Sequence, residues 1–138
     1  MPVELIRSEA LSGDVPYAYA ALVSQGSLVF TAGACPLDGD GEVTPLGDVA
    51  GQAEVVMRNL ERALGAAGAT LADVAKSTVY VATNEREDLV AAWQVVRAAF
   101  GDHDAPSTLV AVPLLGYEGQ LVEVEAVAAV GPDRDPPL

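Results

Sequence analysis

Two carboxylates near the end of the chain are the residues whose type and spacing could best do chemistry. Glu123 and Glu125 stand two positions apart in the apolar run 121–130. Alternate side chains of a strand point the same way, so the two carboxylates are expected on one face, roughly 6.5–7 Å apart. Such a pair could serve as acid and base in glycoside hydrolysis, or one glutamate could simply face solvent. A single partly buried glutamate that polarises a water molecule is the better interpretation, because burial tunes a carboxylate toward neutral pH.

Other candidates are single residues without a diagnostic motif. Cys35 and His103 are the only cysteine and histidine of the chain, and a cysteine–histidine nucleophile pair is conceivable. No spacing supports that pair, so a buried filler cysteine and a solvated loop histidine are the simpler interpretations. Tyr17 alternates with small residues and Tyr117 lies in a glycine-flanked loop, so each could line a pocket or simply pack. Gly33 could let a ligand approach the backbone closely.

Two helices must help to position these residues. Apolar residues recur every three or four positions over residues 49–67 and again over 89–100, which is the spacing of one helical face. Asp48 is a plausible N-cap of the first helix and Gly68 its stop, while Gly101 ends the second.

The remaining ordered stretches are predicted to be six strands. They span residues 3–7, 17–23, 28–32, 77–82, 108–112 and 120–130. Residues 24–27 carry a glycine and are expected to connect the second and third strands as a hairpin. The order β-β-β-α-β-α-β-β predicts an α+β fold with one sheet and both helices on one of its faces. Because the second face of the last strand is also largely apolar, although it holds the two carboxylates, the uncovered face of the sheet needs a partner, and a closed homo-oligomer is expected.

Length and charge exclude several classes of protein. A chain of 138 residues fits a single domain, expected over residues 1–130, with a disordered tail over 131–138. Acidic residues outnumber basic ones by 20 to 7, giving a net charge of −13, which argues against nucleic-acid and anionic membrane partners. No signal peptide, membrane-length apolar run, disulfide framework or histidine-based metal site is visible. We therefore expect a soluble, acidic, cytoplasmic protein without a metal.

Taken segment by segment, the chain resembles the reactive intermediate deaminase family, also called the YjgF or RidA-like family. The resemblance covers about residues 3–130, and the joint order and spacing of its segments are specific. The segments are Pro16-Tyr17, 28–33, Pro36-Leu-Asp38, Gly41, Gln52, Asn59-Leu60, 67–71, Asp73-Val74, 76–81, Phe100 and 121–128. This resemblance implies a chorismate-mutase-like fold and a homotrimer with three small-molecule clefts between subunits. It also implies hydrolysis of enamines and imines, such as 2-aminoacrylate, to 2-keto acids and ammonia, without a metal or organic cofactor.

The functional residues of the family carry over unevenly. The glutamate that helps hold the attacking water matches Glu123, which is therefore the expected catalytic residue. The tyrosine of the second strand matches Tyr17, and the cleft glycine matches Gly33. The substrate-binding residues are expected to be Tyr17, Gly33, Ala34, Cys35, Trp93, Ser107 and Tyr117.

The arginine that clamps the substrate carboxylate in that family has no counterpart here. Ser107 falls in its place, Trp93 stands where an asparagine is usual, and Ala34 replaces a polar residue. A serine donates one neutral hydrogen bond, which is weaker than the charge-assisted fork of an arginine. Arg97 is not expected to reach the cleft from the second helix. An acidic cleft of this kind should therefore favour a neutral or cationic ligand over an anionic one.

Three functions stay open on the sequence alone. The first is hydrolysis of a C=N or related bond in a neutral or differently anchored substrate, with Glu123 orienting the water. The second is a small-molecule-binding or regulatory trimer without turnover. The third is a slow deaminase of 2-imino acids. The endoribonuclease activity ascribed to some relatives fits this charge worst.

Overall fold

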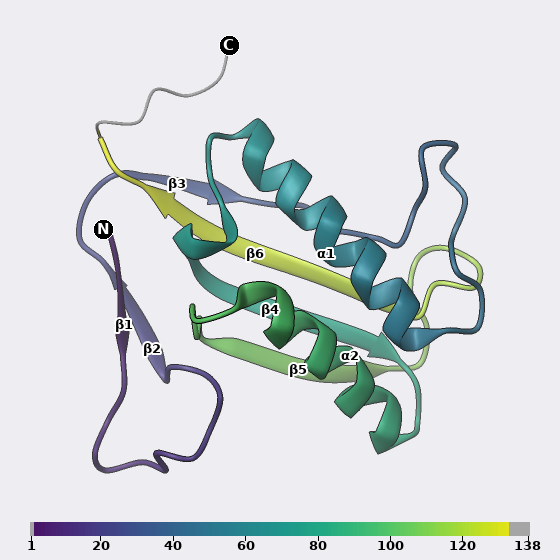
Figure 1. The fold of residues 1–138 in the computed structure, drawn as a ribbon, viewed down its shortest axis with the longest axis horizontal. Coiled ribbons are helices and arrows are strands. Elements are labelled where there is room, and N and C mark those ends of the chain that lie inside the picture. Colours follow the sequence, from purple (N-terminus) through teal and green to yellow (C-terminus); the bar gives the residue numbers. More distant parts are fainter. Residues whose placement is uncertain (1, 133–138) are drawn as a thin grey trace.

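The strands and helices follow one another in the predicted order. The computed structural model describes residues 2–132, so most of the tail predicted over 131–138 lies outside the described residues. The elements are β1 (Val3–Ile6), β2 (Ala20–Val23), β3 (Ser27–Phe30), α1 (Val49–Ala66), η1 (Leu71–Asp73), β4 (Val74–Ala82), α2 (Arg86–Phe100), β5 (Ser107–Val112) and β6 (Val122–Val130). The one addition to the predicted order is the short 3-10 turn η1, which precedes β4 (Figure 1).

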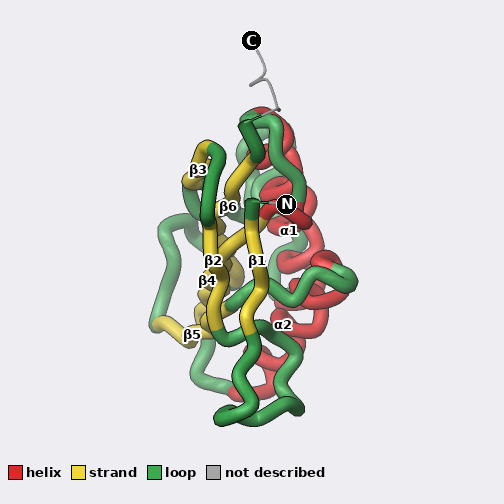
Figure 2. Tube along the Cα trace, turned by 90° about the vertical axis from the view of Figure 1, so that its left-hand side faces the viewer, coloured by secondary structure: helices red, strands yellow, loops and turns green. Residues whose placement is uncertain are grey.

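The six strands are divided between two sheets, where one sheet was expected. β1 pairs with β2 alone, and the second sheet has the order β3-β6-β4-β5. Within it, β4 and β5 are parallel, whereas β6 runs antiparallel to both of its neighbours. Figure 2 shows both helices along one side of the strands. The α+β class and the placement of both helices on one face are therefore confirmed.

The hairpin predicted across residues 24–27 does not form. β2 pairs with β1, and β3 pairs with β6, from Ser27 opposite Val130 to Phe30 opposite Val127. Gly26 does turn the chain, with φ at +96°, and a β-carbon there would overlap the carbonyl oxygen of Val130. The turn signal was correct about the change of direction, but a turn does not determine which strands pair.

The core lies between the helices and the inward face of the four-stranded sheet. Asp48 caps α1 by accepting a hydrogen bond from the Gly51 nitrogen at 2.9 Å. Gly68 and Gly101 follow the two helices with positive φ, as predicted. The fully buried side chains include Val56, Leu60, Leu64, Val79, Val81, Val96, Val122 and Val124.

Within residues 2–132, no helix covers the other face of this sheet. Along β6, Val122 and Val124 point into the core, so Glu123 and Glu125 point away from it. On neighbouring β3, Phe30 is 71% exposed. We call the face of the four-stranded sheet that carries Glu123, Glu125 and Phe30 the open face. No helix within residues 2–132 is long and apolar enough to cross a membrane.

Candidate functional site

A backbone pairing beyond the end of β3 brings a short loop beside Glu123. The Ala34 nitrogen donates to the Val124 carbonyl at 2.7 Å, and the Val124 nitrogen donates back at 3.2 Å. This pairing sets Gly33 and Cys35, which flank Ala34, next to Glu123, which precedes Val124. The methyl group of Ala34 packs against the core, so Ala34 contributes to the site through its backbone and not through its side chain.

The two oxygens of the Glu123 carboxylate have different surroundings. Oε1 accepts hydrogen bonds from Gln120 Nε2 at 3.0 Å and from Cys35 Sγ at 3.3 Å. Oε2 accepts no hydrogen bond from residues 2–132, and it is not a buried atom. The carboxylate lies over Gly33, where an added β-carbon would stand 2.5 Å from Glu123 Cδ. One oxygen is therefore anchored, and the other is left for a water molecule or a ligand.

Cys35 is a hydrogen-bond donor here and not a nucleophile. Burial, followed by the hydrogen bond to Glu123 and its negative charge, raises the pKa of the Cys35 thiol to about 11. The thiol therefore stays protonated near neutral pH. His103 lies elsewhere, with Nε2 2.7 Å from the Val74 carbonyl oxygen and its ring against Phe100. The cysteine–histidine pair considered from the sequence is thus wrong, and His103 is partly buried where a solvated loop residue was expected.

Helix α1 holds both loops of this site through two polar side chains. Buried Gln52 donates to the carbonyls of Pro45 and Gly119 at 2.9 and 3.0 Å, and its Oε1 accepts from the Leu121 nitrogen at 2.7 Å. Asn59 donates to the carbonyls of Cys35 and Leu37 at 2.9 and 3.0 Å. The loop before β6 and the loop after β3 are therefore both fastened to the same helix.

A second group of candidate residues lines a groove of about 400 Å³ at the edge of the sheet. We call it the aromatic groove; its residues are Pro16, Tyr17, Trp93, Ser107, Thr108 and Leu109. The rings of Tyr17 and Trp93 meet edge to face, with centroids 6.5 Å apart, an arrangement that aromatic pairs prefer. The Ser107 hydroxyl contacts that of Ser77 on β4. None of the six residues carries a charge.

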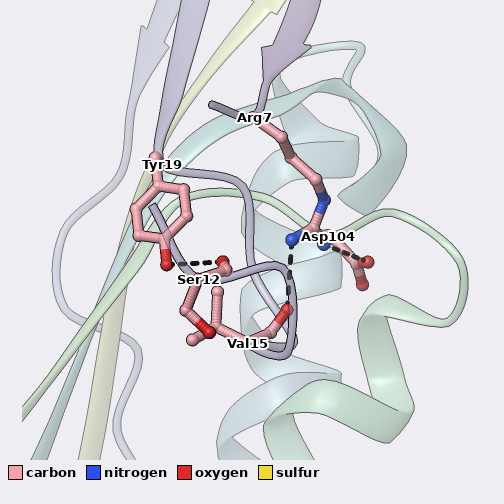
Figure 3. Close-up of polar contacts among 5 residues, drawn as sticks. All are labelled: Arg7, Ser12, Val15, Tyr19 and Asp104. Atoms are coloured by element: carbon pink, nitrogen blue, oxygen red, sulfur yellow. Dashed lines mark hydrogen bonds and ion pairs between the residues drawn. The ribbon is translucent and has the colours of Figure 1, made fainter. Parts of the chain in front are cut away.

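Arg7 holds together the two loops that supply this groove (Figure 3). Its guanidinium donates to the Val15 carbonyl at 3.1 Å and pairs with the Asp104 carboxylate at 3.0 Å. Tyr19 donates to the Ser12 carbonyl at 2.8 Å, which closes the same loop upon itself. The Asp104 carbonyl also accepts a hydrogen bond at 2.8 Å from the backbone nitrogen of Ala18, the residue after Tyr17. The segments that carry Tyr17 and Ser107 are therefore linked.

The Ser107 side chain of the aromatic groove and the Glu123 carboxylate lie on opposite faces of the sheet. Glu123 pairs with Tyr80 on the open face. Ser107 pairs with Ser77, which is completely buried on the helix-covered face, and paired residues share a face. Within one chain, Glu123 and Ser107 therefore cannot contact the same small molecule. Tyr117 is half-exposed, and its backbone nitrogen and carbonyl contact the side chain and the backbone of Gln120.

Two further side chains lie beside these groups. Glu125 shares the open face with Glu123, as predicted, and accepts a hydrogen bond from the Tyr80 hydroxyl at 2.8 Å. That bond, with the burial and charge around it, raises the pKa of Tyr80. Arg97 lines a separate hollow with Pro16 and Trp93, outside the aromatic groove. Within residues 2–132, no group of three His, Cys, Asp or Glu side chains is placed to hold a metal ion.

Gln120 is the site residue that the sequence did not reveal. It is only 3% exposed and donates to the carboxylate of Glu123. The available signal was weak: a glutamine at the start of an apolar run. No spacing rule connects such a residue to a glutamate three positions later in a strand.

Known proteins resemble this chain over almost its full length. The sequence pattern described as Endoribonuclease L-PSP matches residues 9–130. A RutC family protein of Pyrococcus abyssi is 33% identical over 111 residues, which are 80% of this chain and 84% of that protein. The 3-aminoacrylate deaminase RutC of Acinetobacter baylyi is 28% identical over 94% of this chain and all of its own length.

The solved structures agree with the sequence relatives. YyfB of Yersinia pestis, from the conserved Rid protein family, superposes with a TM-score of 0.88 at 28% identity, covering 94% of this chain and 100% of its own. The family pattern spans the segments that carry Glu123 and the aromatic groove. The chain therefore belongs to the Endoribonuclease L-PSP family, that of the Rid, YjgF and RutC proteins.

Proposed function

We propose that this protein hydrolyses the C=N bond of a neutral or cationic imine, or of the enamine that tautomerises to it. The observation that carries the proposal is the asymmetry of the Glu123 carboxylate, in which Oε1 is held by two donors and Oε2 is open. A water bound at Oε2 adds to the imine carbon while its proton moves toward the nitrogen. The carbon–nitrogen bond then breaks, which gives a carbonyl compound and ammonia or an amine.

The proposed substrate charge follows from the aromatic groove. The Acinetobacter baylyi relative is named for the deamination of 3-aminoacrylate, which carries a carboxylate. The groove residues of this chain include no cation, and the chain has a net charge of −13. Lys76 donates to the Thr108 hydroxyl at 2.6 Å, but no cation lines the groove itself, so desolvating a carboxylate there costs free energy. A neutral planar group fits the walls made by Tyr17 and Trp93 better.

We further propose that a complete site forms between copies of the chain in a homotrimer. The aromatic groove of one copy and Glu123 of the next would then meet at one cleft. The separation of Glu123 and Ser107 on opposite faces supports this arrangement, as does the exposed Phe30 on the open face. A cleft built in this way would bury part of the open face.

Mixed assemblies test the shared site. Glu123→Gln and Trp93→Ala variants are each expected to be inactive alone. After the two are unfolded and refolded together, about a quarter of the clefts would combine two intact halves, so activity should return to about that level. Light scattering should give the trimer mass. A mixture that stays inactive, or a monomeric mass, would refute the shared site.

Direct assays test the hydrolysis. Imines generated in situ from amino-acid and neutral amine precursors should disappear faster with the protein, and neutral imines should respond most. Glu123→Gln should abolish the acceleration, whereas Glu54→Gln, an exposed charge change on α1, should leave it unchanged. Equal loss in both variants would contradict the assigned role of Glu123.

A second candidate function is ligand binding without turnover, and the uncharged aromatic groove favours it. Trp93 is the only tryptophan of the chain, so a ligand in the groove should change the intrinsic fluorescence. If neutral ligands change this fluorescence while no imine is consumed, the binding function is correct and the hydrolase is not.

A further inference from the structure

We infer that Cys35 and Gln120 are the positioning residues of Glu123, because together they hold one carboxylate oxygen and so aim the other over Gly33. The inference rests on the proposed role of Glu123 in holding water. Both donors reach the same atom, Oε1, at 3.3 Å from the thiol and 3.0 Å from the amide.

The orientation of the Gln120 side chain is fixed by two other hydrogen bonds and by burial. Its Oε1 accepts from the Tyr117 nitrogen at 3.1 Å, and its Nε2 also donates to the Val122 carbonyl at 3.1 Å. The side chain is 3% exposed. Rotating the amide by half a turn would place its oxygen against a carbonyl and a carboxylate and would leave the Tyr117 nitrogen facing an NH₂ group. The surrounding hydrogen bonds therefore fix the Gln120 amide with its NH₂ group toward Glu123.

Cys35 approaches the same oxygen from a different segment. It follows the Ala34–Val124 pairing, and its carbonyl is held by Asn59 at 2.9 Å. The Gly33 carbonyl, at 3.4 Å, is a second acceptor for the single thiol proton, but the shorter contact and the negative charge of Glu123 favour donation to the carboxylate. A protonated thiol and an amide on two independently anchored loops leave the carboxylate little freedom to rotate. This restraint on Oε1 fixes the position of Oε2 over Gly33.

Reactivity of the thiol tests the contact without any substrate. In the wild-type protein, the rate of Cys35 alkylation by iodoacetamide should rise with a midpoint near pH 11. In Glu123→Gln, the neutral amide removes the negative charge, so the midpoint should fall toward the ordinary thiol value. Glu125→Gln removes a charge from the same strand without touching Cys35 and is the matched control. An unchanged midpoint in Glu123→Gln would overturn the inference.

Turnover tests the positioning itself. Cys35→Ala and Gln120→Leu should each lower kcat about tenfold or more with little change in KM, because they misplace the group that holds water and not the groove. Cys35→Ser keeps a donor and should retain most activity. The double variant Cys35→Ala/Gln120→Leu should lose less than the product of the single losses, since both residues act through one oxygen. Equal rates for Cys35→Ala and Cys35→Ser would contradict the positioning role.

A crystal structure of the double variant separates this inference from the proposed function. The Glu123 carboxylate should leave its place over Gly33 when both donors are gone. If it moves but the wild-type protein consumes no imine, the proposed hydrolysis fails and the positioning contact stands. If it stays in place, the positioning inference fails whatever the activity.

Discussion

The carboxylate of Glu123 lies directly over the α-carbon of Gly33, in the space that any larger side chain would occupy. The backbone of Gly33 does not have a positive φ, so alanine is compatible with its conformation. Glycine is needed here for the room it leaves to a flexible side chain.

Gly33→Ala should therefore impair function and spare the fold. The added methyl group pushes the Glu123 carboxylate aside, and we expect turnover to fall by about a hundredfold. The free energy of unfolding should change by less than about 1 kcal/mol. Gly26→Ala is the matched control, because its positive φ and its overlap with the Val130 carbonyl should cost about 1–2 kcal/mol or more. Thermal unfolding and imine consumption measure both effects; equal destabilisation of the two variants would contradict this explanation.

Gln52→Leu should destabilise the protein strongly. It removes three hydrogen bonds and leaves the Leu121 nitrogen and the Pro45 and Gly119 carbonyls without this partner. An unmet buried group costs about 1–3 kcal/mol, but Gly119 is exposed and its carbonyl can bind water, so the expected loss is about 2 kcal/mol or more. Gln94→Leu, at an exposed position of α2, should change stability by less than about 0.5 kcal/mol. Urea unfolding of both variants gives the comparison, and a small loss in Gln52→Leu would mean that the loop is held by other groups.

Arg7→Ala should weaken ligand binding in the aromatic groove while changing the free energy of unfolding only slightly. The Arg7 and Asp104 side chains are 42% and 32% exposed, so their ion pair should contribute at most about 1 kcal/mol to stability. It nevertheless links the segments that carry Tyr17 and Ser107. We expect weaker ligand binding, read from Trp93 fluorescence, and an unchanged thiol midpoint at Cys35. A ligand affinity equal to that of the wild type would show that the ion pair does not support the groove.

Tyr80 should titrate above the ordinary tyrosine range. Its hydroxyl donates to Glu125, and this bond, burial and the neighbouring carboxylates raise its pKa. Since the folded-state pKa lies above the unfolded value, this contribution to stability is present below the unfolded pKa and is lost as pH rises through the folded one. Glu125→Gln should lower the Tyr80 pKa, as followed by tyrosinate absorbance. Glu118→Gln serves as the control, and identical titrations would contradict the contact.

Ser107→Arg should shift the charge preference of the substrate. A guanidinium at the aromatic groove could pair with a carboxylate through two parallel hydrogen bonds. Imines that bear a carboxylate should then gain at least about tenfold in kcat/KM, while neutral imines should gain nothing. A folded variant with unchanged preference would show that this position does not face the substrate.

Local patterns predicted much of this architecture, because helices are specified by residues close in sequence. The spacing of apolar residues and the caps at Asp48 and Gly101 gave both helices. Alternation along the last strand correctly placed Glu123 and Glu125 on one face. The pairing of β2 and β3 was not recoverable, since the signal at residues 24–27 describes a turn and partner choice depends on distant segments.

The site was recovered in part for the same reason. Gly33, Cys35 and Glu123 do come together, although Gly33 and Glu123 stand 90 positions apart, and the family resemblance suggested the grouping of Gly33 with Glu123. Gln120 was missed because its role follows from its position in space. Glu123 and Ser107 lie on opposite faces because of how β4 is aligned with β5 and with β6. The residue pattern of one strand does not show how that strand is aligned with its neighbours.

Gln52 and Asn59 stand seven residues apart, two turns along the same helix, and each fastens one loop of the Glu123 cluster. The loops can therefore open only if these hydrogen bonds to α1 break, and α1 itself is held by the completely buried Leu60 and Leu64. Amide protons in this cluster should then exchange with solvent more slowly than those of typical binding loops. The cluster around Glu123 is already ordered before a ligand binds, so binding would carry only a small entropic cost for ordering the chain.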